Sequence, residues 1–226
     1  MNPSAAATTA TALMCMLLAS GCRTAPEPAM LTLPLPAAAP PAAAAPPSLA
    51  AHARPTLQVR RVAMPEHLLD RHVRFRLGAG TVVNWPDATW ADRLDVSITE
   101  HLAMRLRTAL PGWNVCVRHC PLQPGALTLR VELAPFDLLL PQGQLVADAH
   151  WWLDIPGAPG PRTQAGLLQH REAVTPPTAA AHAAAIGRLL DQLSGPIAAA
   201  CAARLSSSEH EQRQENDDGQ RNAQKP

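Results

Sequence analysis

The sequence predicts an α+β fold, a single domain in which two main helices pack on one face of a mixed or mostly antiparallel sheet. Short segments between residues 57 and 174 alternate apolar and polar side chains, as half-buried strands do. Two longer segments, 89–110 and 178–205, instead repeat apolar residues at the spacing of an amphipathic helix. Because strands and helices follow one another as strands, helix, strands, helix, both helices are expected on one sheet face.

Several segments carry the strand pattern. In 72–77 valine, phenylalanine and leucine alternate with histidine and arginine, and in 127–133 four apolar residues alternate with threonine, arginine and glutamate. The Gly-Ala-Gly break at 78–80 predicts a hairpin between the first of these strands and the next. The remaining predicted strands are 57–62, 80–85, 113–118, 144–155 and 163–174.

The two helices have different predicted ends. Leucine and isoleucine recur at steps of four through 89–110, and Thr89 with Asp92 resembles a capping box at its start. In 178–205 six apolar residues form one stripe among alanines. Because proline removes a backbone donor and clashes with the preceding turn, Pro196 is expected to kink or split this second helix.

The N-terminus predicts export. Residues 10–19 form an apolar run of about ten positions, too short for a membrane-crossing helix of about 20 residues and typical of a signal-peptide core. The segment 18–21 (Leu-Ala-Ser-Gly) precedes Cys22 and resembles the lipobox of lipoprotein precursors. That resemblance implies removal of 1–21 and acylation of Cys22, palmitate included, which holds the mature chain on a membrane. An ordinary cleaved signal with an incidental cysteine is the alternative.

Two segments are predicted to flank the folded domain, 56–205. The segment 22–55 is rich in alanine and proline, with almost no charge. It is predicted to be a lipidated N-terminus and a semi-extended linker that holds the domain several tens of ångströms from the bilayer. The segment 206–226 has no large apolar residue and is predicted to be a disordered polar tail.

Composition and motifs argue against several function classes. Lys plus Arg is 19 and Asp plus Glu is 18, a formal net charge of +1, so no basic footprint predicts a nucleic-acid partner. The sequence contains no G-x-S-x-G, P-loop or H-E-x-x-H motif. His119 between two cysteines lacks the second ligand pair of a structural zinc site. We therefore expect no catalytic residues, no metal and no cofactor.

Cys116 and Cys120 leave two alternatives open. In an extended strand their Cα atoms would be about 13 Å apart, beyond the roughly 7 Å limit for a disulfide. A turn at 118–119 would close that distance, whereas without it the two thiols stay separate. Cys201 lies on the apolar stripe of the second helix and is expected to pack in the core.

Alternation in 148–155 separates two adjacent tryptophans. Trp151 falls among apolar residues, whereas Trp152 and His150 fall on a polar face between two aspartates. A partly exposed tryptophan among charges is a typical anchor for a protein partner. Trp152 and His150 are therefore predicted partner contacts, and the alternative is that a loop or helix covers that face.

Several features in fixed order resemble the ABC-type transport auxiliary lipoprotein family. They include Trp90-Ala91 at the predicted opening of the long helix. The others are the lipobox, the segments 30–34 and 57–65, the hairpin that follows, and 110–113 after the helix. The resemblance implies lipid attachment at Cys22 and structural roles for Trp90, Ala91, Leu94 and Trp151. Arg23 after the cysteine, in place of aspartate, indicates the outer membrane by the usual sorting rule.

The resemblance also implies a function. Such a protein is a non-catalytic lipoprotein on the periplasmic face of the outer membrane, an accessory of an MCE-type intermembrane lipid transport system that supports envelope integrity. Its implied partner is an inner-membrane protein with a periplasmic MCE domain, and a homo-oligomer is also compatible with it. The rival hypotheses are a periplasmic lipid carrier and a structural envelope lipoprotein without a transporter. A carrier needs a long apolar cavity.

Overall fold

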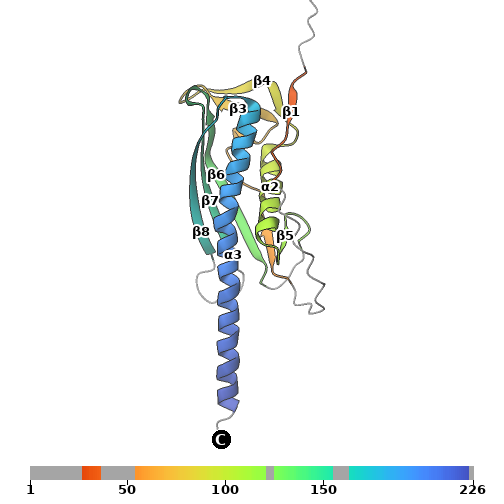
Figure 1. The fold of residues 1–226 in the computed structure, drawn as a ribbon, viewed down its shortest axis with the longest axis vertical. Coiled ribbons are helices and arrows are strands. Elements are labelled where there is room, and N and C mark those ends of the chain that lie inside the picture. Colours follow the sequence, from red (N-terminus) through yellow and green to blue (C-terminus); the bar gives the residue numbers. More distant parts are fainter. Residues whose placement is uncertain (1–26, 37–53, 121–124, 155–162, 224–226) are drawn as a thin grey trace, which may run out of the picture.

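An eight-stranded mixed sheet and two long helices on one of its faces form the protein (Figure 1). The computed structural model describes residues 27–36, 54–120, 125–154 and 163–223. The predicted α+β class, with its mixed sheet and two main helices, is confirmed. The strands are β1 (Ala29–Leu31), β2 (Thr56–Val59), β3 (His72–Arg76), β4 (Val82–Trp90), β5 (Asn114–Cys116), β6 (Leu127–Leu139), β7 (Gln144–Asp154) and β8 (Thr163–Ala173).

Strand β6 organises the sheet because it pairs along both of its edges. β7 runs antiparallel along one edge, and β8 follows β7 as the last strand on that side. β2 and β3 pair in parallel with the start and the end of β6, and they lead to β5 and to β4 with β1. Two short 3-10 helices, η1 (Glu66–Leu68) and η2 (Leu140–Gln142), lie in the connections.

The sheet begins earlier in the chain than predicted. β1 pairs in parallel with the end of β4, and the Ala91 amide donates to the Leu31 carbonyl oxygen at 2.8 Å. Leu33 is only 2 % exposed, and Pro34 lies against Gly187. The predicted linker 22–55 therefore needs correction, because 29–34 belong to the domain. The burial of Leu33 gives the physical reason, and residues 37–53 lie outside the described part.

The first helix, α2 (Leu94–Ala109), begins five residues later than predicted. Thr89 pairs with His72 of β3 and Met30 of β1, so it extends β4 instead of capping a helix. Arg93 is the N-cap, without a side-chain capping bond, and its guanidinium pairs with Asp95 at 3.1 Å. The predicted helix start was wrong because two neighbouring strands satisfy the backbone of this segment.

The second helix, α3 (Ala179–Ala223), passes through Pro196 as one element (Figure 1). The predicted split was wrong, because Leu193 and Ile197 on either side of the proline are both fully buried in the same core. Tertiary packing thus holds the two halves together despite the lost backbone bond. The helix also includes 206–223, where a disordered tail was predicted. Glu, Gln and Arg are frequent there, and these residues form helices readily.

The two helices contact each other through a charged pair as well as through the core. Arg105 on α2 is buried, and its Nε donates to the Asp191 carboxylate of α3 at 2.6 Å. Arg105 Nη2 donates to the Gly187 carbonyl oxygen at 3.2 Å. These bonds fix α2 against α3 over the face of the sheet that holds Trp151. The opposite face of β6, β7 and β8 is therefore left to the candidate site.

Candidate docking surface

Strand β7 has the alternation that the sequence predicts. Ala149, Trp151 and Leu153 are buried on the face toward the helices, whereas His150 and Trp152 are partly exposed on the other. The face toward the helices is identified by β8, where His170 hydrogen-bonds Gln192 of α3 at 3.1 Å. The two adjacent tryptophans thus occupy opposite sides of the sheet.

Five side chains form what we call the outer patch: Arg130, His150, Trp152, Asp154 and Leu167. The Arg130 guanidinium carbon lies 5.7 Å from the Trp152 ring centroid, and the His150 ring stacks on Trp152 with centroids 6.1 Å apart. Leu167 of β8, which pairs with His150, is 53 % exposed. An exposed leucine beside an aromatic stack is an apolar centre within a polar rim, as protein interfaces have.

Most of the charges around this centre are already paired, whereas Glu132, which lies opposite His150 on β6, has no ion pair among the described residues. Arg130 binds Asp154 through two bonds of 2.8 and 3.2 Å, and Thr163 donates to the same carboxylate at 3.0 Å. The bond from Arg130 is the main reason why the pKa of Asp154 is lowered. Farther along the face, Arg171 pairs with Asp148 at 2.8 Å. The Arg130–Asp154 pair holds Arg130 over the Trp152 ring. Because these charges are already paired, a protein that binds here desolvates little unpaired charge.

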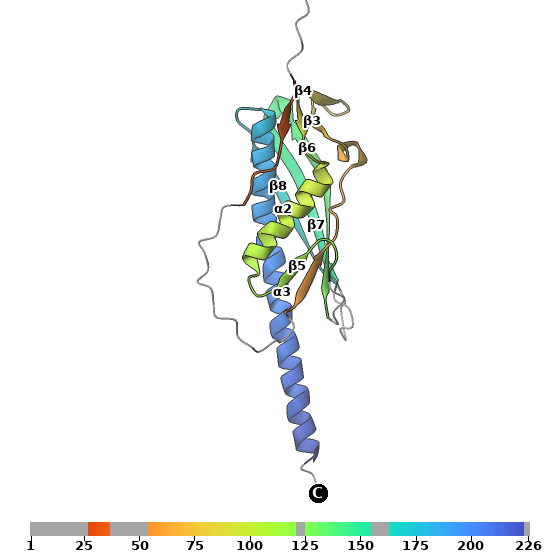
Figure 2. The ribbon, with the colours of Figure 1, turned by 90° about the vertical axis from the view of Figure 1, so that its right-hand side faces the viewer.

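Of the alternative that a loop or helix covers this face, the described residues test only the helix, and neither helix covers it. Both helices lie on the opposite face of the sheet (Figures 1 and 2). Strand β8 is exposed at most of its positions. Within the described part of the chain the outer patch is therefore open, residues 155–162 lie outside that part, and the role of the patch as a partner contact stays a prediction.

The cysteines differ in bonding and burial. Cys22 lies outside the described residues. A disulfide joins Cys116 and Cys120, whose Cα atoms are 5.6 Å apart. His119 between them has φ of 51°, the turn that brings the two sulfur atoms together. Cys201 is fully buried on α3, and burial raises the pKa of its thiol to about 12, so it stays protonated.

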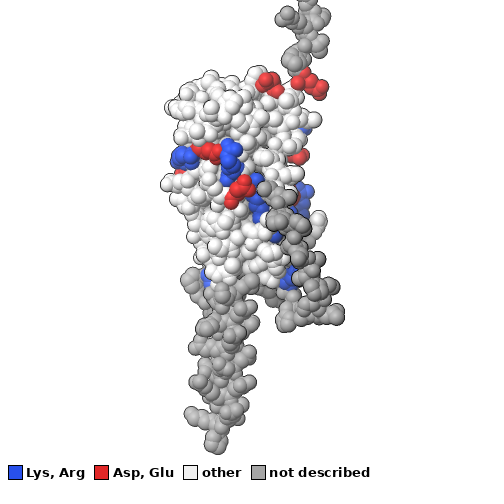
Figure 3. Space-filling view, viewed as in Figure 1, with Lys and Arg blue, Asp and Glu red and all other residues white. Residues whose placement is uncertain are grey.

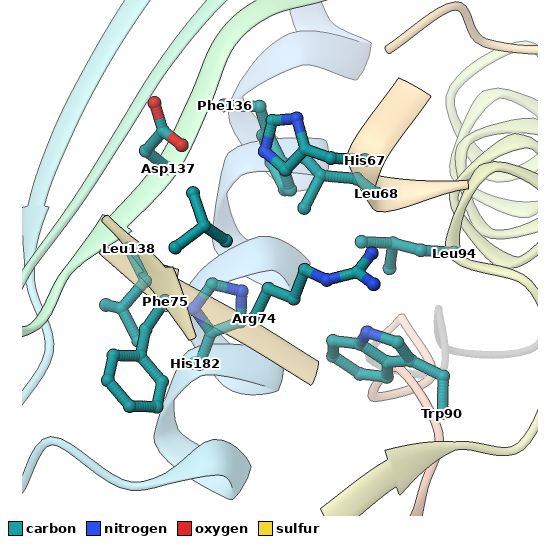
Figure 4. Close-up of a pocket in the computed structure, with 11 residues that line it drawn as sticks. His67, Leu68, Arg74, Phe75, Trp90, Leu94, Phe136, Asp137, Leu138 and His182 are labelled. Atoms are coloured by element: carbon teal, nitrogen blue, oxygen red, sulfur yellow. The ribbon is translucent and has the colours of Figure 1, made fainter. Parts of the chain in front are cut away.

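A small cavity lies between the end of the sheet and α3. Figure 4 shows His182 of α3 reaching toward Arg74, with Leu138 and Trp90 also lining the space. Its volume is about 10 Å³, which is enough for one water molecule. Two ring nitrogens there, Nδ1 of His182 and Nε2 of His67, have no protein hydrogen-bond partner. Burial lowers the pKa of His182 to about 4, so its imidazole is neutral at physiological pH.

A second hollow is an open groove of about 380 Å³ between α2 and β5. Charged Asp92, Glu100, Arg107 and Arg118 line it together with valines. Within the described part of the chain, no group of three His, Cys, Asp or Glu side chains is arranged to hold a metal ion. No helix in that same part is long and apolar enough to cross a membrane.

Comparison with known proteins identifies the class. The family model of the ABC-type transport auxiliary lipoprotein component matches residues 33–198. The chain belongs to this family, as its sequence features predict. The match begins at Leu33, the residue that is buried next to β1. Comparison with curated proteins gives no match.

Two solved structures share the fold. An uncharacterized protein is 21% identical, with a TM-score of 0.61 over 77% of this chain and 99% of that chain. A Xanthomonas campestris protein from the family DUF330 is 13% identical, with a TM-score of 0.52 over 81% of this chain and 97% of that chain. At these identities the likeness shows the fold alone.

Sequence reasoning missed three features near the candidate site. It did not find β1, Leu167 as the most exposed apolar residue of the outer patch, or the Arg130 contacts. Strand alternation places Leu167 and Arg130 on a face. Only the pairing of β8 with β7, and of β7 with β6, brings them beside Trp152.

Proposed function

We propose that this protein is a non-catalytic accessory lipoprotein of an MCE-type intermembrane lipid transport system, held on the periplasmic face of the outer membrane by acyl chains on Cys22. Family membership and the lipobox support the anchor and the link to transport. The observation that carries the docking role is the outer patch, an exposed leucine beside an aromatic stack on the sheet face that neither helix covers (Figures 1 and 2). An MCE-domain protein is the proposed occupant.

The cavities favour docking over lipid carriage. An acyl chain needs a long apolar tunnel, whereas the cavity beside His182 holds about one water molecule. The groove between α2 and β5 is large but open, and charged side chains line it. Neither hollow suits a lipid tail, so the domain is proposed to act on the transporter without holding the lipid inside itself.

Site-specific photocrosslinking in intact cells tests the docking role. A photoreactive amino acid at Leu167, in the outer patch, should capture the MCE-domain protein of the cell envelope. The matched control is Thr108, which is exposed on α2 on the other side of the molecule. Capture at Thr108 and not at Leu167 would refute docking through the outer patch.

Fractionation tests the anchor separately. Cys22→Ala should leave an uncleaved or soluble precursor, because the acyl chains supply the anchoring free energy of about 0.8 kcal/mol per buried methylene. Normal processing and full recovery of the variant with the outer membrane would contradict lipidation at Cys22.

A further inference from the structure

The chain enters the domain at the end that carries the β3–β4 hairpin. β1 runs parallel to β4, with Ala29 beside Ala88, so its first residue points back toward the start of β4. Figure 2 shows β1 and the β3–β4 hairpin at the same end of the molecule, opposite the C-terminus of α3. The proposed anchor therefore attaches at the hairpin end.

The tether between anchor and domain is short. Seven residue steps separate Cys22 from Ala29, and a fully extended chain spans at most about 3.6 Å per step, or about 25 Å. The long Ala/Pro segment follows β1 and connects it to β2, so it does not lengthen this tether. A domain anchored at Cys22 is thus held close to the bilayer, with its hairpin end toward the lipid.

The hairpin tip, residues 77–82 (Leu-Gly-Ala-Gly-Thr-Val), projects from the body of the domain. All six residues are exposed, with Leu77 at 50 % and Val82 at 37 %. A Cβ atom added at Gly78 or Gly80 would meet nothing within 4 Å. The tip therefore presents one half-exposed large apolar side chain, Leu77, whereas Val82 is more covered because it also lines the cavity beside His182.

The tip is also free of charge. No charged residue occurs from 77 to 86, and the arginine before the tip, Arg76, pairs with Asp137 at 2.7 Å. In Figure 3 the charged groups of this face gather across the middle of the domain. The hairpin end is uncharged there, except for acidic side chains beside β1. An uncharged apolar tip enters a lipid interface without the cost of burying ions.

We propose that the hairpin tip is a second membrane contact, which inserts Leu77 into the lipid surface where Cys22 anchors the protein. This inference rests on the proposed lipidation of Cys22. The two contacts together orient the domain, so that the C-terminus of α3 points away from the membrane. The outer patch lies near the start of β6, whereas β3 pairs with its end, so the patch is held away from the bilayer and open to a protein that approaches through the periplasm.

Fluorescence from the tip tests this contact in the lipidated full-length protein. The protein is reconstituted into vesicles of phosphatidylethanolamine and phosphatidylglycerol, with an NBD fluorophore on Ala79→Cys or, as the control, on Thr108→Cys. Cys116 and Cys120 are bonded and Cys201 is buried, so the dye labels the introduced cysteine. Emission from the tip label should rise severalfold and be quenched by doxyl-labelled lipid, and the control label should do neither.

A single substitution separates contact from folding. Leu77→Asp should abolish the quenching of the Ala79 label, while the melting temperature stays nearly unchanged because the Leu77 side chain is exposed. Flotation on a density gradient reports the anchor in the same samples. If the parent protein with the Ala79→Cys label floats with the vesicles but its label is unquenched, the tip contact is overturned and the anchor is left standing. Protein that does not float overturns both.

A tip label that changes only when the MCE-domain partner is added would also overturn the proposal, because it would show a protein occupant in place of lipid.

Discussion

Alanine substitutions at Trp151 and Trp152 should separate packing from docking. Trp151 is 5 % exposed, and its ring lies against Gly166 of β8. Its truncation removes a large buried ring and should cost about 3 to 5 kcal/mol, as for other buried aromatic residues. For a domain of this size that lowers the melting temperature by about 10 °C.

Trp152→Ala should behave differently, because the side chain is partly exposed. It loses the cation–π contact with Arg130 and the stacked His150, which together contribute about 1 kcal/mol. Binding of the MCE-domain partner should nevertheless weaken about thirtyfold, the equivalent of about 2 kcal/mol for a tryptophan anchor.

Thermal melts of both variants, followed by binding of the purified partner, check this pair of expectations. Val146→Ala is the control, since it changes an apolar side chain on the same face of β7, away from the outer patch. Equal destabilisation by Trp152→Ala and Trp151→Ala would show that both faces of β7 are buried. Unchanged partner affinity in Trp152→Ala would refute its role as an anchor.

Three further predictions concern packing, protonation and the C-terminal segment. Gly166→Ala should destabilise by about 1–3 kcal/mol, because its Cβ would lie 2.4 Å from the Trp151 ring; urea unfolding that matches the parent would contradict this contact. The pKa of His182 is about 4 in the folded protein, below its unfolded value of 6.5. The unfolded chain therefore binds the proton first, and the free energy of unfolding decreases as the pH is lowered. Between pH 7 and pH 5 the loss should be about 2 kcal/mol. His182→Leu should remove that part of the slope in urea titrations, while His101 remains; a slope that His182→Leu leaves unchanged would refute the assignment. Deletion from Glu209 onward should shift the melting temperature by less than about 4 °C, since that polar sequence offers little apolar area; a larger drop in calorimetry would show that the segment packs.

Local patterns were sufficient where one side of a strand faces the core and the other faces solvent. Alternation in 127–133 of β6 and 148–154 of β7 predicted the buried faces there, including the opposite orientations of Trp151 and Trp152, but not the continuation of β6 to Leu139. The helical spacing in α2 predicted its buried stripe, with Ile98, Leu102 and Leu106 fully buried. These predictions succeed because a side chain's direction follows from the backbone period alone.

The candidate site was only partly accessible in this way. The sequence places Trp152 and His150 on a polar face, but Leu167 joins them only because β8 pairs with β7 in one register. Cys116 and Cys120 left two alternatives open, and the turn at His119 decides between them.

What the sequence determined by itself was therefore the α+β class, the faces of the long strands and the buried stripe of each helix. Only the tertiary structure decided that Thr89 extends β4, that α3 continues through Pro196 and that β1 belongs to the sheet. The physical reason is shared by all three. Propensity and periodicity describe a segment alone, whereas partners distant in sequence satisfy the backbone of Thr89 and β1 and bury the side chains on both sides of Pro196.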